Sequence, residues 1–311
     1  MKISIIGAGN VGGLTAMRLV EAGFGDVVLV DITEGLAQGK AFDLEDAGSI
    51  LKFSYHIQGT DDIENTKNSD IIIITAGLAR KPGMTREDLL NKNAQILKDV
   101  CLKIKKISPQ SIVIVVTNPL DLMTYLALKI TGFKSHKVFG MGISLDTARF
   151  ANLISRELNI PNTDIEACVI GSHGEGMLPL PRFTTVKDMK LNELLEAEKI
   201  EALIKKTLER GQEIVSLLGN GSAYFAPSQA ILSIVRAIVK DEKRMIGVSA
   251  YLNGEYGIKD ICIGVPCRLG KEGIEKVIEF DLNKEERPLF LKSTESIHEI
   301  LDLIKPFYHG L

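Results

Sequence analysis

One turn near the start of the chain constrains the fold more than any other feature. It reads Gly7-Ala8-Gly9-Asn10-Val11-Gly12 and follows a short β-branched run at residues 3–6. A helical pattern covers residues 14–22, and a second apolar run at 27–30 ends at Asp31. Strand, glycine turn, helix, strand and terminal acid are together the pattern of a βαβ unit that binds a dinucleotide.

Each residue type in this unit has a physical reason. Gly7 permits the tight turn, Gly9 lets a pyrophosphate approach the backbone, and Gly12 lets the helix pack on the strand. The helix N-terminus offers unpaired N–H groups to the phosphates. Asp31, about 20 residues further on, accepts hydrogen bonds from a ribose and repels a 2′-phosphate, and the next residue is Ile32 rather than arginine. The sequence therefore predicts NAD rather than NADP as the cofactor.

Strand and helix patterns continue to alternate after this unit. Apolar runs cover residues 70–75, 111–116 and 138–141, and helical patterns cover 87–106 and 120–130. Strands that alternate with helices predict an α/β fold, here a Rossmann domain with a doubly wound parallel sheet. Ligands bind at the carboxyl ends of such strands. Thr117-Asn118-Pro119 lies at one of these ends.

A cationic loop at residues 77–86 leaves another of these strand ends. It contains Arg80, Lys81 and Arg86 and is punctuated by glycine and proline. Exposed arginines are most often solvated charge. Arg80 and Arg86 project from a predicted binding edge, and a guanidinium is well shaped to bind a carboxylate.

A histidine stands in a second glycine-rich turn, Gly171-Ser172-His173-Gly174-Glu175-Gly176, after an apolar run at 167–170. This pattern predicts a buried strand that presents an imidazole at its end. On its own it fits either a hydrogen-bonded turn histidine or a general acid/base. A helix predicted at 144–158 carries Asp146 and Arg149 on one face. They form either a surface salt bridge or a buried pair that faces the histidine.

The second half of the chain predicts a different arrangement from the first. We place a Rossmann domain at residues 1–143 and an α+β substrate domain at 144–311. The patterns behind the second domain are helices at 193–218, 227–240 and 288–304, with antiparallel strands at 244–251 and 258–268.

Composition narrows the class of protein. The formal net charge is -3 and the cations are scattered, which favours neither nucleic acid nor an anionic membrane as a partner. The start of the chain lacks the pattern of a signal peptide, and no apolar run reaches the ~20 residues that a membrane span needs. Four cysteines without a CxxC pair predict reduced, buried thiols, no metal site and a cytoplasmic location.

The order of these motifs resembles the lactate/malate dehydrogenase family. Within it, the chain is most similar to the NAD-dependent malate dehydrogenases of lactate-dehydrogenase-like type, and the resemblance covers essentially the whole chain. The matching motifs are the glycine turn, Asp31, 79–83, 117–119, 145–150 and 171–175.

The resemblance implies a role for each site residue. His173 takes the hydroxyl proton of malate, and Asp146 orients its imidazole. Arg149 binds the C1 carboxylate, Arg86 polarises the ketone of oxaloacetate, and Asn118 contacts the substrate and the nicotinamide ribose. The resemblance also implies further cofactor contacts at Asn93, Val116 and Thr117, besides those of the glycine turn and Asp31.

By the same resemblance, Arg80 selects the substrate. The lactate enzymes of the family usually have glutamine at this position. Oxaloacetate has a second carboxylate that can pair with Arg80, whereas pyruvate would leave the cation unpaired. Losing one partner of a buried pair costs about 3–5 kcal/mol, or roughly two to four powers of ten in rate. The sequence therefore favours malate over lactate.

The chain departs from the family pattern at Ser172, Glu175 and Gly176. Other readings are a lactate or other 2-hydroxy acid dehydrogenase, an NAD-dependent glycosidase, and a non-catalytic NAD-binding module. The glycosidases need a Cys/His metal site, and the module would not need the arginines together with His173. Relatives in the family imply a homodimer or homotetramer.

Overall fold

A computed structural model describes residues 1–78, 85–174, 176–219 and 221–310, with the side chain of Arg86 left out. The helices are α1 (Asn10–Ala22), α2 (Leu36–Ile50), α3 (Arg86–Ile107), α4 (Leu120–Thr131), α5 (Ile143–Leu158), α6 (Leu191–Leu194), α7 (Ala197–Leu218), α8 (Phe225–Val239) and α9 (Glu286–Tyr308). The strands are β1 (Lys2–Ile6), β2 (Asp26–Val30), β3 (Ile57–Thr60), β4 (Ile71–Ile74), β5 (Ile112–Val115), β6 (Val138–Gly140), β7 (Ile165–Glu166), β8 (Val169–Gly171), β9 (Met177–Pro179), β10 (Thr185–Val186), β11 (Met189–Lys190), β12 (Arg244–Asn253), β13 (Lys259–Gly270) and β14 (Gly273–Val277).

The first half of the chain forms a parallel sheet with the strand order β3-β2-β1-β4-β5-β6. This is the order of a doubly wound dinucleotide-binding fold. Its central strand β4 consists of four isoleucines that are all buried, as expected for a strand covered on both faces. The predicted Rossmann sheet is confirmed.

The sheet does not end where the first half ends. β6 pairs antiparallel with β12 between Gly140 and Ser249, and β13, β8 and β9 follow, with β14 on β13. Within the described residues this makes one 11-stranded sheet, and a small sheet of β11, β10 and β7 stands apart from it. The two halves of the chain are therefore joined by continuous strand pairing.

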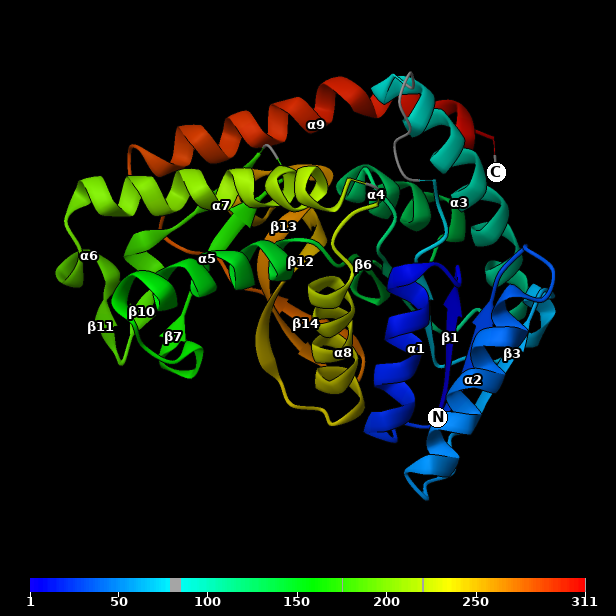
Figure 1. The fold of residues 1–311 in the computed structure, drawn as a ribbon. Coiled ribbons are helices and arrows are strands. Elements are labelled where there is room, and N and C mark those ends of the chain that lie inside the picture. Colours follow the sequence, from blue (N-terminus) through cyan, green and yellow to red (C-terminus); the bar gives the residue numbers. More distant parts are fainter. Residues whose placement is uncertain (79–84, 175, 220, 311) are drawn as a thin grey trace.

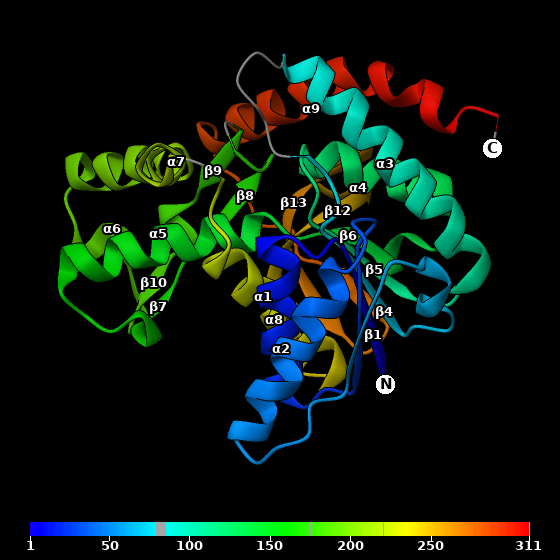
Figure 2. The same ribbon diagram turned by 45° about the vertical axis from the view of Figure 1, so that its right-hand side comes forward.

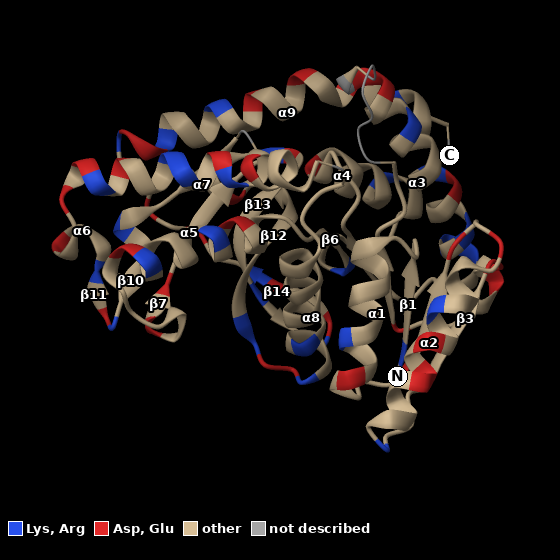
Figure 3. Ribbon diagram, viewed as in Figure 1, with Lys and Arg blue, Asp and Glu red and all other residues tan. Residues whose placement is uncertain are grey.

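Helices cover both faces of this sheet (Figures 1 and 2). α1 and α8 pack side by side although they are far apart in the sequence, and α9 runs across α3 and α4. Charges of both signs alternate along α7 and α9 (Figure 3), while the buried residues of these helices, such as Leu203 and Ile297, lie in the core. Among the described residues, none of the helices combines the length and the apolar character required to cross a bilayer.

The predicted strands and helices are confirmed, with small shifts at their ends and one error. The helix predicted at 193–218 is broken into α6 and α7, because Leu195 and Glu196 take extended conformations. The break lets Leu191 and Ile200 enter the same buried cluster. The strands β3, β7, β9, β10, β11 and β14 were not predicted.

Candidate active site

The glycine turn joins β1 to α1 and is built for close backbone approach. A Cβ at Gly12 would lie 1.8 Å from the carbonyl oxygen of Gly7, so only glycine lets the helix pack this tightly on the strand. A Cβ at Gly9 would meet nothing within 4 Å. Gly9 is the N-cap of α1 and has no side chain that could accept from the first N–H groups of the helix. These N–H groups are therefore left beside open space. The turn therefore fits the pyrophosphate of a dinucleotide.

Asp31 and Lys40 hold this turn from the side. Asp31 follows β2, and its Oδ2 accepts a hydrogen bond from the N–H of Ala8 (2.7 Å). Lys40 on α2 donates from Nζ to the carbonyl oxygens of Ala8 (2.6 Å) and Gly9 (3.3 Å). A carboxylate has further lone pairs, so Asp31 can still accept from a ribose. Lys40 was not predicted, because a lone lysine on a polar helix reads as a solvated side chain.

The other predicted cofactor contacts lie along the same edge of the sheet. Asn118 is exposed just after β5, and Thr117 beside it is buried, with its hydroxyl donating to the carbonyl of Ala76 (2.6 Å). The buried Asn93 donates to the carbonyl of Asn118 (2.8 Å) and accepts from the N–H of Leu78 (2.8 Å). Asn93 therefore ties two strand ends together.

Three further residues predicted to contact the cofactor lie close to these groups, namely Val116, Asn10 and Val11. Val116 donates its N–H to the carbonyl of Ile74 (2.9 Å), which continues the pairing of β5 with β4. In the glycine turn, Asn10 is exposed and Val11 is half-buried. A direct contact of these residues with the cofactor stays a prediction.

His173, Asp146 and Arg149 form one connected group. Asp146 on α5 is fully buried, and its Oδ2 accepts from Nδ1 of His173 at 2.6 Å. Its Oδ1 accepts from Nη1 of Arg149 at 3.0 Å. Since a carboxylate only accepts, Nδ1 carries the hydrogen and Nε2 is the ring nitrogen left to exchange a proton with a substrate. Of the two readings of the Asp146–Arg149 pair, the structure shows the one that faces the histidine.

Arg149 has N–H donors that are not used in hydrogen bonds to the described residues. Its buried Nε has no hydrogen-bond partner among the described residues, and its guanidinium lies against Gly211 of α7. A planar guanidinium with unused donors binds a carboxylate well. The group therefore combines a proton-transfer nitrogen with an anchor for an anion.

Local backbone geometry brings the imidazole to this place. Gly171 and Gly174 on either side of His173 have φ of +94° and +100°, a region that L side chains rarely adopt. The start of α5 packs directly against the histidine, because a Cβ at Gly142 would lie 3.0 Å from the Cβ of His173. The turn after β8 thus presents His173 beside Asp146.

Two opposing effects set the pKa of His173. Burial lowers this pKa, while the charge and hydrogen bond of Asp146, together with the charge of Asp121, raise it. The charge of Arg149 acts in the same direction as burial. The balance places the pKa of His173 above its ordinary value, so the imidazole holds its proton more readily than a free histidine.

A second carboxylate, Asp121 in the first turn of α4, also contacts the turn that carries His173. It accepts from the main-chain N–H of His173 (2.9 Å) and from the hydroxyl of Ser172 (2.9 Å). Asp121 was not predicted as a site residue. The available signal was a carboxylate inside an otherwise apolar helix, since buried charges are normally paired.

The predicted cationic loop at 77–86 lies mostly outside the described residues. Arg80 lies outside the described residues, as does Glu175 beside the catalytic turn. Arg86 is the first residue of α3, and its side chain is likewise outside the description. The contacts of Arg80 and Arg86 with substrate stay predictions.

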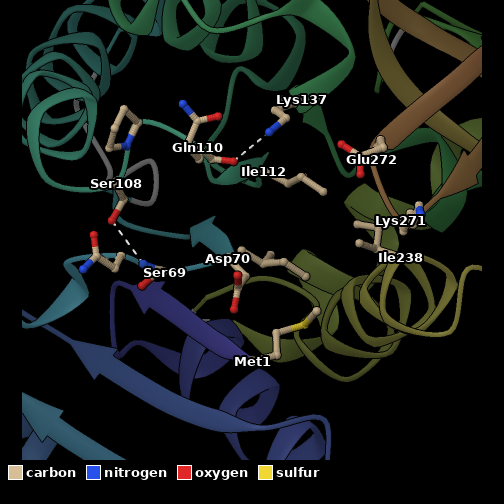
Figure 4. Close-up of a pocket in the computed structure, with 13 residues that line it drawn as sticks. Met1, Ser69, Asp70, Ser108, Gln110, Ile112, Lys137, Ile238, Lys271 and Glu272 are labelled. Carbon is tan, nitrogen blue, oxygen red and sulfur yellow. Dashed lines mark hydrogen bonds between the residues drawn. The ribbon is translucent and has the colours of Figure 1, made fainter.

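A separate hollow of about 350 Å³ lies at the opposite edge of the sheet (Figure 4). Asp70 and Gln110 in its wall stand just before β4 and β5, so the hollow opens at the amino ends of the parallel strands. None of the predicted site residues lines it. Ligands of this fold class bind at the carboxyl ends, and the predicted site lies there.

The sheet order and the glycine turn define a Rossmann domain of the class that binds a dinucleotide. Residues 1–140 match the lactate/malate dehydrogenase NAD binding domain, and residues 143–308 match the lactate/malate dehydrogenase alpha/beta C-terminal domain. The chain belongs to the lactate/malate dehydrogenase family. This membership decides against the glycosidase and the non-catalytic module.

Similar proteins carry the names of both enzymes of the family. A malate dehydrogenase of Methanosarcina mazei is 50% identical over 96% of this chain and 97% of its own. The crystal structure of Cryptosporidium parvum malate dehydrogenase is 41% identical, with a TM-score of 0.95 over 98% of this chain and 99% of its own. The lactate dehydrogenase of Eimeria maxima with NADH and oxamate has the same TM-score of 0.95 at 36% identity, over 99% of this chain and 95% of its own.

Proposed function

We propose that this protein is a malate dehydrogenase that reversibly oxidises (S)-malate to oxaloacetate with NAD. The observation that carries the proposal is the connected group of His173, Asp146 and Arg149, with bonds of 2.6 and 3.0 Å, in a chain of this family. About 50% identity to proteins named malate dehydrogenase supports the choice of substrate.

The residues of the chain divide the chemistry between them. NAD, held by the glycine turn and Asp31, would supply the acceptor for the hydride from C2 of malate. Nε2 of His173 accepts the hydroxyl proton, and Asp146 stabilises the imidazolium that forms. In the reverse direction the imidazolium returns this proton to the oxygen of the ketone. The pKa of His173 lies above its ordinary value. This supports an imidazole that keeps the proton taken up in malate oxidation until oxaloacetate reduction uses it.

The arginines give the substrate its orientation. Arg149 holds the C1 carboxylate with parallel N–H groups, and its unused donors support this role. Arg86 polarises the C2 oxygen, and Asn118 orients the substrate from the strand end. Arg80 pairs with the second carboxylate, which pyruvate lacks.

The cofactor is held by the edge of the parallel sheet. The glycine turn and the N-terminus of α1 bind the pyrophosphate, and Asp31 binds the ribose. Asn93, Val116 and Thr117 lie near the nicotinamide end. We assign residues 1–143 to the NAD-binding Rossmann domain, which also supplies Arg80, Arg86 and Asn118 to the substrate. Residues 144–311 form the α+β catalytic and substrate domain, although the two parts share one sheet.

Exposed apolar side chains support a symmetric homo-oligomer, a dimer or a tetramer. Phe42 and Ile50 on α2 are 64% and 83% exposed, and Phe225 on α8 is 64% exposed. Large apolar side chains gathered on helices are common at subunit interfaces.

The four free, buried cysteines support a reducing, cytoplasmic location.

The test is an NADH oxidation assay with oxaloacetate, pyruvate and 2-oxoisocaproate side by side. We expect oxaloacetate to be reduced fastest by two or more powers of ten in kcat/KM. Arg80→Gln loses about 3–5 kcal/mol of transition-state binding for oxaloacetate and gains pyruvate reduction. Lys81→Gln, a neighbouring cation of the same loop, is the control. Full oxaloacetate activity in Arg80→Gln would show that this arginine does not select the substrate.

A further inference from the structure

Asp121 is a carboxylate enclosed by the core. It lies in the first turn of α4, whose other residues in that turn, such as Leu122 and Met123, are buried and apolar, and its own exposed fraction is 4%. α4 packs against β12 and β13 at the centre of the molecule (Figure 1). A buried carboxylate is costly unless hydrogen bonds compensate it, so its partners show what it is kept for.

The partners of Asp121 come from both halves of the chain and include the catalytic turn. Oδ1 accepts from the hydroxyl of Ser249 on β12 at 2.6 Å. Oδ2 accepts from the hydroxyl of Ser172 and from the main-chain N–H of His173, both at 2.9 Å. The N–H group can only donate, so this position requires an acceptor.

His173 is thus held at two points by two carboxylates. Asp146 on α5 fixes the ring through Nδ1, and Asp121 on α4 fixes the backbone from which the ring projects. Ser172, where the chain departs from the family pattern, supplies one of the donors to Asp121. Asp121 also stands three residues after Asn118, so one short segment contacts both the substrate edge and the catalytic turn.

We propose that Asp121 is a positioning residue for proton transfer, which fixes the main chain of His173 and stabilises the imidazolium by its negative charge. This inference rests on the proposed function, because it assigns Asp121 to the same histidine.

The charged and titratable groups around His173 and Asp121 are few among the described residues. Asp146 and Arg149 on α5 face His173, and Cys262 on β13 lies near Asp121. Burial raises the pKa of Asp121, and the hydrogen bonds from Ser249, His173 and Ser172 oppose this rise. The charge of Asp121 in turn raises the pKa of His173. Loss of this charge therefore moves the pKa of His173 downward.

The experiment compares Asp121→Asn with the wild type in oxaloacetate reduction from pH 5 to 10. The amide removes the charge and one of the two acceptor oxygens, so it cannot accept from His173, Ser172 and Ser249 as the carboxylate does, and the turn is held less firmly. We expect kcat to fall roughly ten- to a hundredfold, since small misplacements at a reacting centre have such effects. The pH above which reduction declines moves down, while the Kd of NADH and the Tm stay close to wild type. Ser293→Ala is the matched control, because Ser293 bonds the N–H of Ser172 without contacting Asp121, and its pH profile stays that of the wild type.

An Asp121→Asn protein with wild-type kcat and pH profile would overturn the proposal. If that variant does not fold, Ser249→Ala decides, since it removes the only described partner of Oδ1. A three- to tenfold lower kcat at unchanged NADH affinity supports the proposal, and an unchanged kcat refutes it. Wild type and His173→Asn are measured alongside. A wild type inactive on oxaloacetate, or an active His173→Asn, would refute the proposed function and with it the role of Asp121. A wild-type kcat in Asp121→Asn beside an inactive His173→Asn would refute the role of Asp121 alone.

Discussion

The turn after β1 and the turn after β8 are both rich in glycine, yet they build their parts of the site in different ways. The first presents backbone, and its tightest contact is the approach of Gly12 to the carbonyl oxygen of Gly7. The second presents one side chain, His173, held by carboxylates from α4 and α5. The turn after β1 works because its glycines lack side chains, whereas the turn after β8 works because side chains from several elements meet at His173. Substitutions in the two turns should therefore fail differently.

The largest effect is expected at the converging turn. His173→Asn removes proton transfer and keeps a polar side chain of similar reach, so kcat should fall by a factor of about 10²–10⁴. NADH binding, measured by fluorescence titration, should stay at the wild-type Kd. His298→Asn, an exposed histidine on α9, is the control. Near-normal turnover in His173→Asn would contradict its assignment as the acid/base.

Substitutions in the glycine turn after β1 should affect protein stability and NADH binding separately. In Gly12→Ala the new methyl collides with backbone, and we expect the free energy of unfolding to fall by about 1–3 kcal/mol or more. Gly9 has open space and a φ of -66°, so Gly9→Ala should fold normally and bind NADH less tightly. Denaturant titration and NADH titration of both variants measure this. Unchanged NADH binding in Gly9→Ala would show that the open space at Gly9 is not kept for a ligand, and equal loss of stability in both variants would contradict the open space itself.

A smaller effect is expected at Lys40. Its ammonium group satisfies the carbonyl oxygens of Ala8 and Gly9, and a charged hydrogen bond contributes about 1.5–3 kcal/mol. Lys40→Met should weaken NADH binding about tenfold or more at unchanged kcat. Lys67→Met, an exposed lysine, is the control. If the KM for NADH does not change in Lys40→Met, the lysine does not shape the turn.

The same contrast explains what could be predicted from the sequence. The backbone turn is local, so the spacing of its glycines and Asp31 predicted the two strands and the helix around it and a doubly wound parallel sheet. The convergence of Asp121, Ser249 and His173 depends on pairing between β6 and β12, which no local pattern encodes. The family resemblance supplied roles for Asp146 and Arg149. It gave no reason to connect a carboxylate of α4 with the main chain of His173.

The most direct test of the account is the pH dependence of oxaloacetate reduction in the wild type and in Asp146→Asn. Reduction consumes the proton of His173, so kcat/KM should be highest below the pKa of His173 and fall as the pH rises through it. Asp146 raises this pKa, so its loss should move the decline to lower pH and reduce kcat/KM at neutral pH. Glu157→Gln, a surface carboxylate of α5 that pairs with Lys199, should leave the profile unchanged. A decline at the same pH in Asp146→Asn and the wild type would contradict the claim that this pair carries the proton transfer.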